Sequence, residues 1–201
     1  MTSDKPTYEP ARDARDLEEA AATESSEQRL YYLGQAALCW SDDGNHVRAL
    51  ELLAEVAAAR HEYPDQNWVL PLYAYELFTV GRAEEAWAMV EAAEEHIRSA
   101  GGSYDHEQLA GYLADAGHLD RAVDHYTAAL ELLLGGDDRP DRDPAQRRGA
   151  QEHSPVPRIR TARRQIREQL GLPEDALDRT PDPTAPQRPS FAERWRLRRR
   201  T

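Results

Sequence analysis

The side chains best suited to chemistry in this 201-residue chain are its histidines. They are His46, His61, His96, His106, His118, His125 and His153. A zinc-protease helix requires two histidines four residues apart with a glutamate between them, and no pair here fits that pattern. His118 and His125 are two helical turns apart with Asp115 and Asp124 nearby, which would allow a surface metal site. Because charged residues commonly flank histidines on solvated helix faces, we expect no metal site.

The sequence also lacks the motifs of other enzyme classes. Cys39 is the single cysteine, which excludes a zinc site built from several thiolates. The glycine pairs at 101–102 and 135–136 lack the lysine and spacing of a phosphate-binding loop. No serine occupies a nucleophile elbow. We therefore expect no catalysis and no cofactor.

The net charge of −12 conceals two halves of opposite sign. Residues 1–140 contain 28 acidic and 10 basic side chains, a balance of −18. Residues 141–201 contain 9 acidic and 15 basic side chains, a balance of +6. This split predicts a basic tail with an electrostatic role, either against the acidic body or against another anionic surface.

Composition favours a helical protein of the bacterial cytoplasm. Alanine and leucine outnumber isoleucine, valine and phenylalanine, which favours helix over sheet. No run of about 18 apolar residues could span a membrane, and the first ten residues lack the apolar core of a secretory signal. A lone cysteine suits a reducing compartment. One lysine beside 24 arginines is typical of a high-GC bacterial coding bias.

A pattern of glycine and small residues recurs three times along the chain. Gly44, Gly81 and Gly117 lie 37 and then 36 residues apart. An apolar helical run precedes each glycine, and a second run with alanine at the same offset follows it. Internal periods of this size indicate stacked helical hairpins. An irregular helical bundle with chance alanines is the alternative.

These residues resemble the tetratricopeptide repeat family over residues 27–134. The small positions of that family's pattern are filled by Ala37, Ala74, Ala110, Ala49, Ala86, Ala122, Val56, Ala93 and Ala129, and its loop glycine by Gly44, Gly81 and Gly117. The chain departs from the family at the usual proline, where it has His61, Arg98 and Leu134, and its units exceed the usual length of about 34 residues. The resemblance implies an all-α superhelix of about three hairpins that binds proteins without catalysis.

The chain divides into five expected segments. They are a polar, partly helical extension (1–26), three hairpins (27–134), a flexible linker (135–156), a capping helix (157–172) and a disordered Pro-rich and Arg-rich tail (173–201). Within the extension, Leu17 is almost the only large apolar residue among residues 9–22, which predicts a solvated helix. Pro71 suits only a first turn, so the helix that contains it is expected to start near Asn67. Residues 157–171 are expected to dock on the last hairpin, with an independent basic helix as the alternative.

The resemblance also implies a binding groove lined by the first helix of each hairpin. The expected lining residues are Tyr31, Leu38, Trp68, Tyr75, Phe78, Tyr104 and Glu107. No basic residue occupies the positions where family members clamp a chaperone's C-terminal carboxylate, so that partner is not expected. An aromatic groove with acidic flanks suits an apolar or basic peptide or helix. The alternative for each ring is packing between the hairpins.

The C-terminal residues offer a second function of another class. The residues expected to make contacts are Arg194, Trp195, Arg196, Arg198, Arg199 and Arg200. They could bind the chain's own acidic body, an anionic membrane or nucleic acid. Because the acidic body opposes nucleic acid, the main prediction remains a scaffold for protein–protein interaction.

Overall fold

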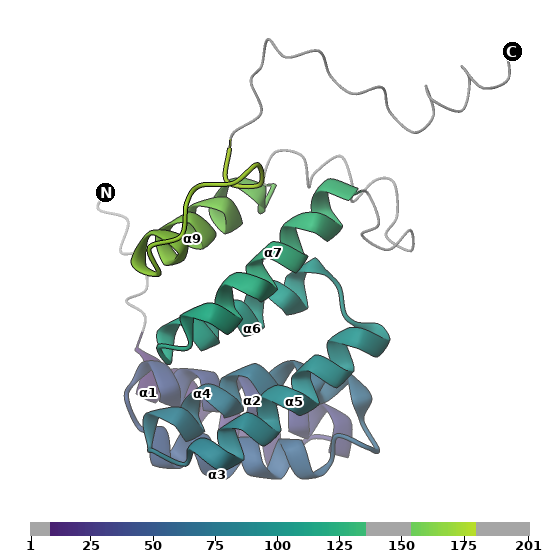
Figure 1. Ribbon diagram of the computed structural model, residues 1–201. Coiled ribbons are helices and arrows are strands. Elements are labelled where there is room, and N and C mark those ends of the chain that lie inside the picture. The colour runs from purple at the N-terminus through teal and green to yellow at the C-terminus, as the bar shows by residue number, and fades with distance from the viewer. Residues whose placement is uncertain (1–8, 136–153, 180–201) are drawn as a thin grey trace, which may run out of the picture.

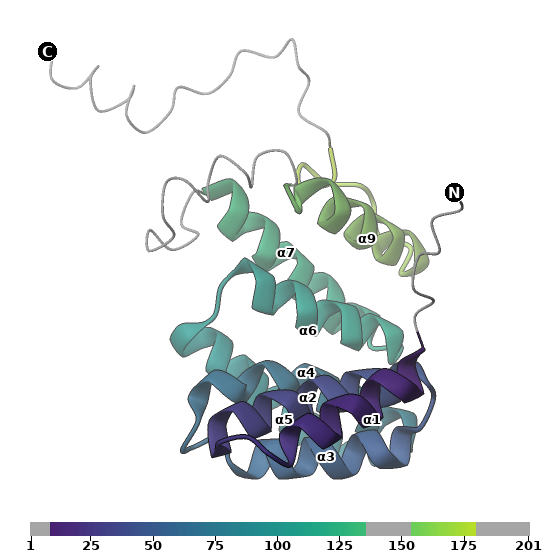
Figure 2. The ribbon, with the colours of Figure 1, turned by 180° about the vertical axis from the view of Figure 1, so that it is seen from behind.

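A computed structural model describes residues 9–135 and 154–179, and this part of the chain is entirely helical, without strands (Figures 1 and 2). Its elements are α1 (Pro10–Ala21), α2 (Ser26–Asp42), α3 (His46–Ala58), the 3-10 helix η1 (Pro64–Val69), α4 (Leu70–Thr79), α5 (Ala83–Ala100), α6 (Ser103–Asp115), α7 (Leu119–Gly135) and α9 (Val156–Gln169). The expected all-α class is therefore confirmed for the described residues.

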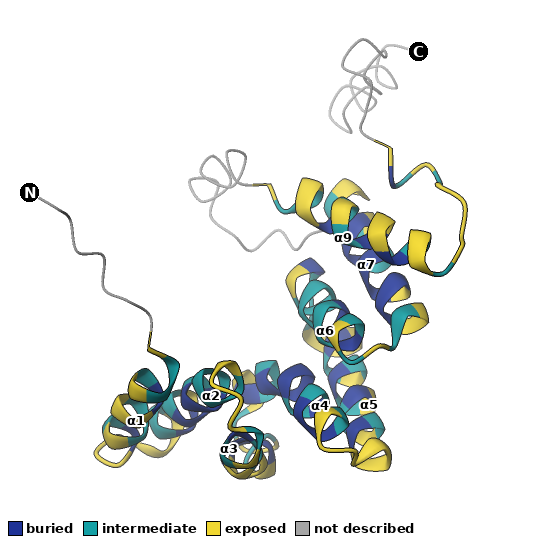
Figure 3. Cartoon of the chain, turned by 90° about the vertical axis from the view of Figure 1, so that its left-hand side faces the viewer, coloured by how far each residue is buried: buried dark blue, intermediate teal, exposed yellow. Residues whose placement is uncertain are grey.

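Neighbouring helices pack in pairs along the chain. The most extensive contacts join α1 with α2, α2 with α3, α4 with α5, α6 with α7, and α7 with α9. Helix α4 also contacts both α3 and α6. In Figure 3, α1 to α5 lie together in the lower part of the view, with α3 below α2, and α6, α7 and α9 lead away from them. Helix α4 thus connects the two halves of the molecule.

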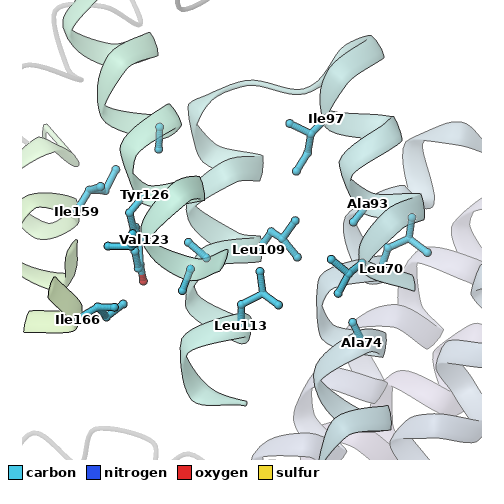
Figure 4. Packing of buried hydrophobic residues seen from close by; sticks show 14 of the residues in the cluster. Leu70, Ala74, Ala93, Ile97, Leu109, Leu113, Val123, Tyr126, Ile159 and Ile166 are labelled. Atoms are coloured by element: carbon cyan, nitrogen blue, oxygen red, sulfur yellow. The ribbon is translucent and has the colours of Figure 1, made fainter. Parts of the chain in front are cut away.

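Two apolar cores meet at α4. Leu72 belongs to the core shared by α1, α2, α3 and η1. Leu70 and Ala74 belong to the core that continues through α5, α6, α7 and α9 (Figure 4). In that second core, Ile159 of α9 is 1% exposed. Stacking each pair on the next therefore buries faces that no single pair could cover.

Three turns between paired helices share one backbone conformation. Gly44, Gly81 and Gly117 have φ of 78°, 81° and 85°, a left-handed region that side chains with a Cβ rarely adopt. The residue after each glycine donates its N–H to the carbonyl five residues earlier, at 2.8–2.9 Å. Each glycine donates to the carbonyl three residues earlier. These paired bonds satisfy the last carbonyls of α2, α4 and α6.

Small residues lie where the paired helices approach most closely. Ala49, Ala86 and Ala122 each follow their turn glycine by five residues and are completely buried. Ala37 and Ala110 on the preceding helices are also completely buried. A larger side chain at these positions would have to push two backbones apart.

Helix α1 corrects one expectation, because it packs against α2 and is not solvated. Its Ala14 and Ala21 are buried, and Glu18 binds two later helices. The Glu18 carboxylate accepts a hydrogen bond from Trp40 Nε1 at 2.6 Å and pairs with Arg48. Hydropathy missed this docking because Leu17 is the one large apolar residue of α1 that packs on this core, and two alanines and the polar Glu18 make the rest of the contact.

The start of α4 corrects another expectation. The sequence places the beginning of this helix near Asn67, but residues 64–69 form a 3-10 helix and the α-helix begins at Leu70. Pro71 then lies within the first turn, where its missing N–H costs no hydrogen bond.

Helix α9 lies where the sequence predicts a capping helix, and it packs against α7. The guanidinium of Arg163 donates to Thr127 Oγ1 at 2.8 Å and pairs with Asp175 and Asp178. Residues 173–179, assigned to a disordered tail, are therefore held against α9 by their carboxylates. The rest of that tail, with the arginines expected to make contacts, and linker residues 136–153 lie outside the described residues. Every helix described is too short or too polar to cross a membrane.

The buried alanines give a direct test of helix packing. Ala86→Leu should overpack the contact between α4 and α5 and lower the free energy of unfolding by about 1–3 kcal/mol. Glu84→Ala, on the exposed face of the same helix, should change it little. Thermal melts of the two variants check this, and coincident melting curves would contradict the packing described.

The Glu18–Arg48 contact predicts a pH dependence of stability. The hydrogen bond from Arg48 holds the pKa of Glu18 below its ordinary value of 4.5. Since folding lowers this pKa, the contact stabilises the fold above 4.5 and its contribution is lost as the pH falls through the folded-state value. Glu18→Gln should cost up to about 1 kcal/mol near neutral pH, and the gap to wild type should shrink toward about pH 3.

Denaturant unfolding across this pH range measures the gap. Glu19→Gln, which removes an exposed charge from the same helix, is the control and should show little difference at any pH. A Glu18→Gln gap that does not change with pH would show that the carboxylate's charge does not contribute.

Candidate functional site

A groove of about 350 Å³ lies between α2, η1, α4, α5 and α6. It is lined by Tyr31, Gln35 and Leu38 of α2, Asn67 and Trp68 of η1, Pro71 and Leu72 of α4, Ala93, His96 and Ile97 of α5, and Tyr104, Asp105, Gln108 and Tyr112 of α6. The short η1 segment lies among the α-helices and contributes the largest ring.

Four of the seven residues predicted for a groove line this one. Tyr31, Leu38, Trp68 and Tyr104 come from three elements far apart in the sequence. Tyr31 and Tyr104 are 44% and 59% exposed, so both rings present apolar surface to solvent. The Tyr31 and Trp68 ring centroids lie 6.2 Å apart with planes tilted by 56°. The groove thus combines open aromatic surface with a half-buried indole.

The position of Trp68 depends on a glycine of α2. A Cβ built on Gly34 would lie 2.7 Å from Trp68 Cζ2 and 3.0 Å from Val69 Cγ1. Real Cβ atoms do not approach so closely, so the indole lies directly on the glycine backbone. Gly34 therefore allows η1 to place Trp68 against α2.

Three predicted residues lie elsewhere. The ring of Tyr75 packs on Tyr112 with centroids 5.7 Å apart. Phe78 packs edge-on against Trp87 at 5.2 Å. Glu107 pairs with Arg158 of α9 at 2.8 Å. Tyr75 thus connects α4 with α6, Phe78 connects α4 with α5, and Glu107 connects α6 with α9.

Sequence reasoning missed the polar part of the groove. Gln35, Asn67 and Gln108 bring amide groups, and Asp105 brings a carboxylate. On α6 the lining residues follow the spacing 104, 108 and 112, so the groove face is turned by one residue from the predicted 104 and 107. The repeated four-residue step from Tyr104 through Gln108 to Tyr112 was the signal that could have found it.

Tyr112 forms part of the wall as a neutral phenol. Burial raises its pKa to about 12, and nearby Asp42 adds to the effect. The hydroxyl therefore keeps its proton near neutral pH and can donate a hydrogen bond.

His106 of α6 and His125 of α7 bind each other. The Nδ1 atoms of His106 and His125 lie 3.0 Å apart, and His125 Nε2 lies 3.2 Å from Glu94 Oε1. Since one Nδ1 must donate and the other accept, this bond requires at least one neutral ring. Burial lowers the pKa of both imidazoles, which favours that state.

The pair of histidines considered for a metal site has separate partners. His118 packs on Phe78 at 4.2 Å between ring centroids, whereas His125 binds His106 and Glu94. Among the described residues, no group of three or more His, Cys, Asp or Glu side chains could hold a metal ion.

A buried carboxylate links a turn to α4. Glu76 is completely buried and accepts a hydrogen bond from the Ser41 hydroxyl. His46 Nδ1 lies 2.8 Å from its other oxygen. An activated serine needs its hydroxyl on the imidazole, but here both groups bind the carboxylate. The cluster therefore joins α2, α3 and α4 and does not form a nucleophile relay.

Comparison with known proteins gave no match among family models, curated proteins or solved structures.

The contact between Gly34 and Trp68 can be tested with matched glycine substitutions. Gly111→Ala in α6 would bring its Cβ no closer than 3.7 Å to Tyr126 Oη, so it should stabilise the fold by about 0.5–1 kcal/mol. Gly34→Ala should give no such gain, because the Trp68 ring must move to admit the methyl group. Chemical denaturation measures the free energy of unfolding of both variants. Equal stabilisation by both would contradict the close contact between Trp68 and Gly34.

Proposed function

We propose that this chain is a non-catalytic scaffold whose three hairpins form a tetratricopeptide-like superhelix and bind a peptide or short helix in the groove. The observation that carries the proposal is the convergence of Tyr31, Leu38, Trp68 and Tyr104 from separate hairpins on one groove. On composition, we assign the scaffold to the bacterial cytoplasm.

The likeness between the hairpins supports the repeat part of this proposal. Three turns have the same left-handed glycine and the same pair of hydrogen bonds. An alanine at the same offset from each glycine is completely buried. The same glycine turn also ends α9 at Gly171, so the support for a repeat comes from the combination of this turn with a buried alanine at periods of 37 and 36 residues.

The lining of the groove supports a peptide as the bound species. Exposed phenol rings and the half-buried Trp68 provide apolar surface that a peptide side chain would cover. The amides of Gln35, Asn67 and Gln108 can both donate to and accept from a peptide backbone. No arginine or lysine lines the groove, so a C-terminal carboxylate is disfavoured and an apolar or basic segment is favoured.

The alternative of binding an anionic surface rests on residues 194–200, which lie outside the described part of the chain. The groove is therefore the candidate site whose lining residues are described and can be replaced one by one. Catalysis has no place in the proposal, since the Ser41, His46 and Glu76 side chains are arranged as a structural link.

Selection from a phage-displayed library of random dodecapeptides tests the proposed function. The wild-type chain should enrich peptides whose affinity falls by at least about thirtyfold in the double variant Tyr31→Ala and Tyr104→Ala, because each ring contributes more than about 1 kcal/mol at a binding hot spot. Both rings are exposed, so the variant should keep its helical circular dichroism and its melting temperature.

The matched control replaces two exposed apolar residues outside the groove, Val47→Ala and Val80→Ala, and should leave affinity unchanged. Equal affinity of the tyrosine double variant and wild type for every enriched peptide would contradict binding in this groove.

A further inference from the structure

The lining of the groove contains one carboxylate, Asp105, and its one basic side chain is the imidazole of His96, which lies 3.3 Å from the Asn67 amide. Asp105, three residues after the N-cap of α6, lines the groove beside the exposed Tyr104. Its Oδ2 atom accepts the backbone N–H of Gly102 at 2.7 Å, which holds the side chain in one orientation. No arginine or lysine lines the groove with it. A cation that enters therefore meets a carboxylate that is already positioned.

The surrounding charge adds to this preference. Residues 9–135 contain 25 acidic and 8 basic side chains. Such an excess gives a negative potential, which a concave site with apolar walls concentrates. Anionic ligands are repelled, and cationic ligands are attracted before they make contact.

The aromatic walls favour a flat cation. Tyr31, Trp68 and Tyr104 present π surfaces in the same groove as Asp105. A guanidinium group stacks on aromatic faces, is weakly hydrated and donates five hydrogen bonds in one plane. A lysine ammonium is a compact, strongly hydrated charge that cannot use ring faces and several acceptors at once. The side-chain carbonyls of Gln35, Asn67 and Gln108 are further acceptors for such a plane of donors.

We infer that the groove recognises an arginine side chain of the bound peptide, with the guanidinium against the Tyr31, Trp68 and Tyr104 rings and paired with Asp105. This inference rests on the proposed function, because it names the partner as an arginine-containing peptide segment. The apolar parts of the groove, such as Leu38 and Leu72, then take the neighbouring side chains of that segment.

The test uses the same displayed dodecapeptide library with two variants of α6. Asp105→Asn removes the charge and keeps an oxygen for the Gly102 N–H, so the start of the helix is preserved. Asp115→Asn removes one charge from the exposed end of the same helix, outside the groove. Peptides enriched by the wild-type chain should share an arginine at one position. Selection on Asp105→Asn should lose that arginine, whereas selection on Asp115→Asn should keep it.

Fluorescence anisotropy with the strongest enriched peptide then measures the coupling. Asp105→Asn should weaken binding about tenfold, and Asp115→Asn by less than about twofold. Replacing the peptide's arginine with lysine should cost at least as much as Asp105→Asn. With that arginine replaced by alanine, Asp105→Asn should have no further effect, because the pair is already broken.

The outcomes separate this inference from the proposed function. Enriched peptides without a shared arginine, or equal effects of the two asparagine variants, would overturn the arginine subsite. Loss of binding in the Tyr31→Ala and Tyr104→Ala variant would then still place peptides in the groove. If that tyrosine variant also binds every enriched peptide as wild type does, the proposed function and the arginine subsite both fall.

Discussion

The left-handed backbone at three glycines is the constraint on which the arrangement of this chain depends. Gly44, Gly81 and Gly117 end their helices with the same pair of turn hydrogen bonds, so each following helix leaves in the same way. Five residues later, a completely buried alanine lets the second helix lie close to the first. The groove is lined by residues of α2, η1, α4, α5 and α6 from the helix pairs that these turns connect. A side chain at any of these glycines would strain the turn that sets this geometry.

Carboxylates bind these helices to one another as well as making the surface acidic. Glu18 joins α1 to α2 and α3, and Glu76 joins α4 to the end of α2 and the start of α3. At the other end of the molecule, Arg163 of α9 is buried against Thr127 of α7 and against two aspartates of the segment that follows. Part of the negative charge is therefore neutralised within the fold. The groove keeps one carboxylate, Asp105, without an arginine or lysine in its lining.

Features with a local cause could be predicted from the sequence. The glycine spacing and the alanine stripes follow from backbone sterics and helical periodicity, so the all-α class and the turn positions could be found without coordinates. The docking of α1 could not, because it depends on Glu18 meeting Trp40 and Arg48 from distant segments. Of the residues counted from the glycines, Tyr31, Leu38, Trp68 and Tyr104 line the groove of the structure. The same counting missed Asp105 and Tyr112. The face of α6 that lines the groove differs by one residue from the expected face, because packing against neighbouring helices sets the orientation of α6.

The central claim is that peptide binding occurs at Trp68, between the hairpins. The most direct measurement is a two-dimensional NMR titration of the indole N–H signals with an enriched peptide. Trp40 lies in the contact with α1, and Trp87 packs on Phe78 and His118 away from the groove. The account predicts a saturable shift of the Trp68 signal while the Trp40 and Trp87 signals stay in place. A saturable shift of Trp87 or Trp40 with Trp68 unchanged would contradict it.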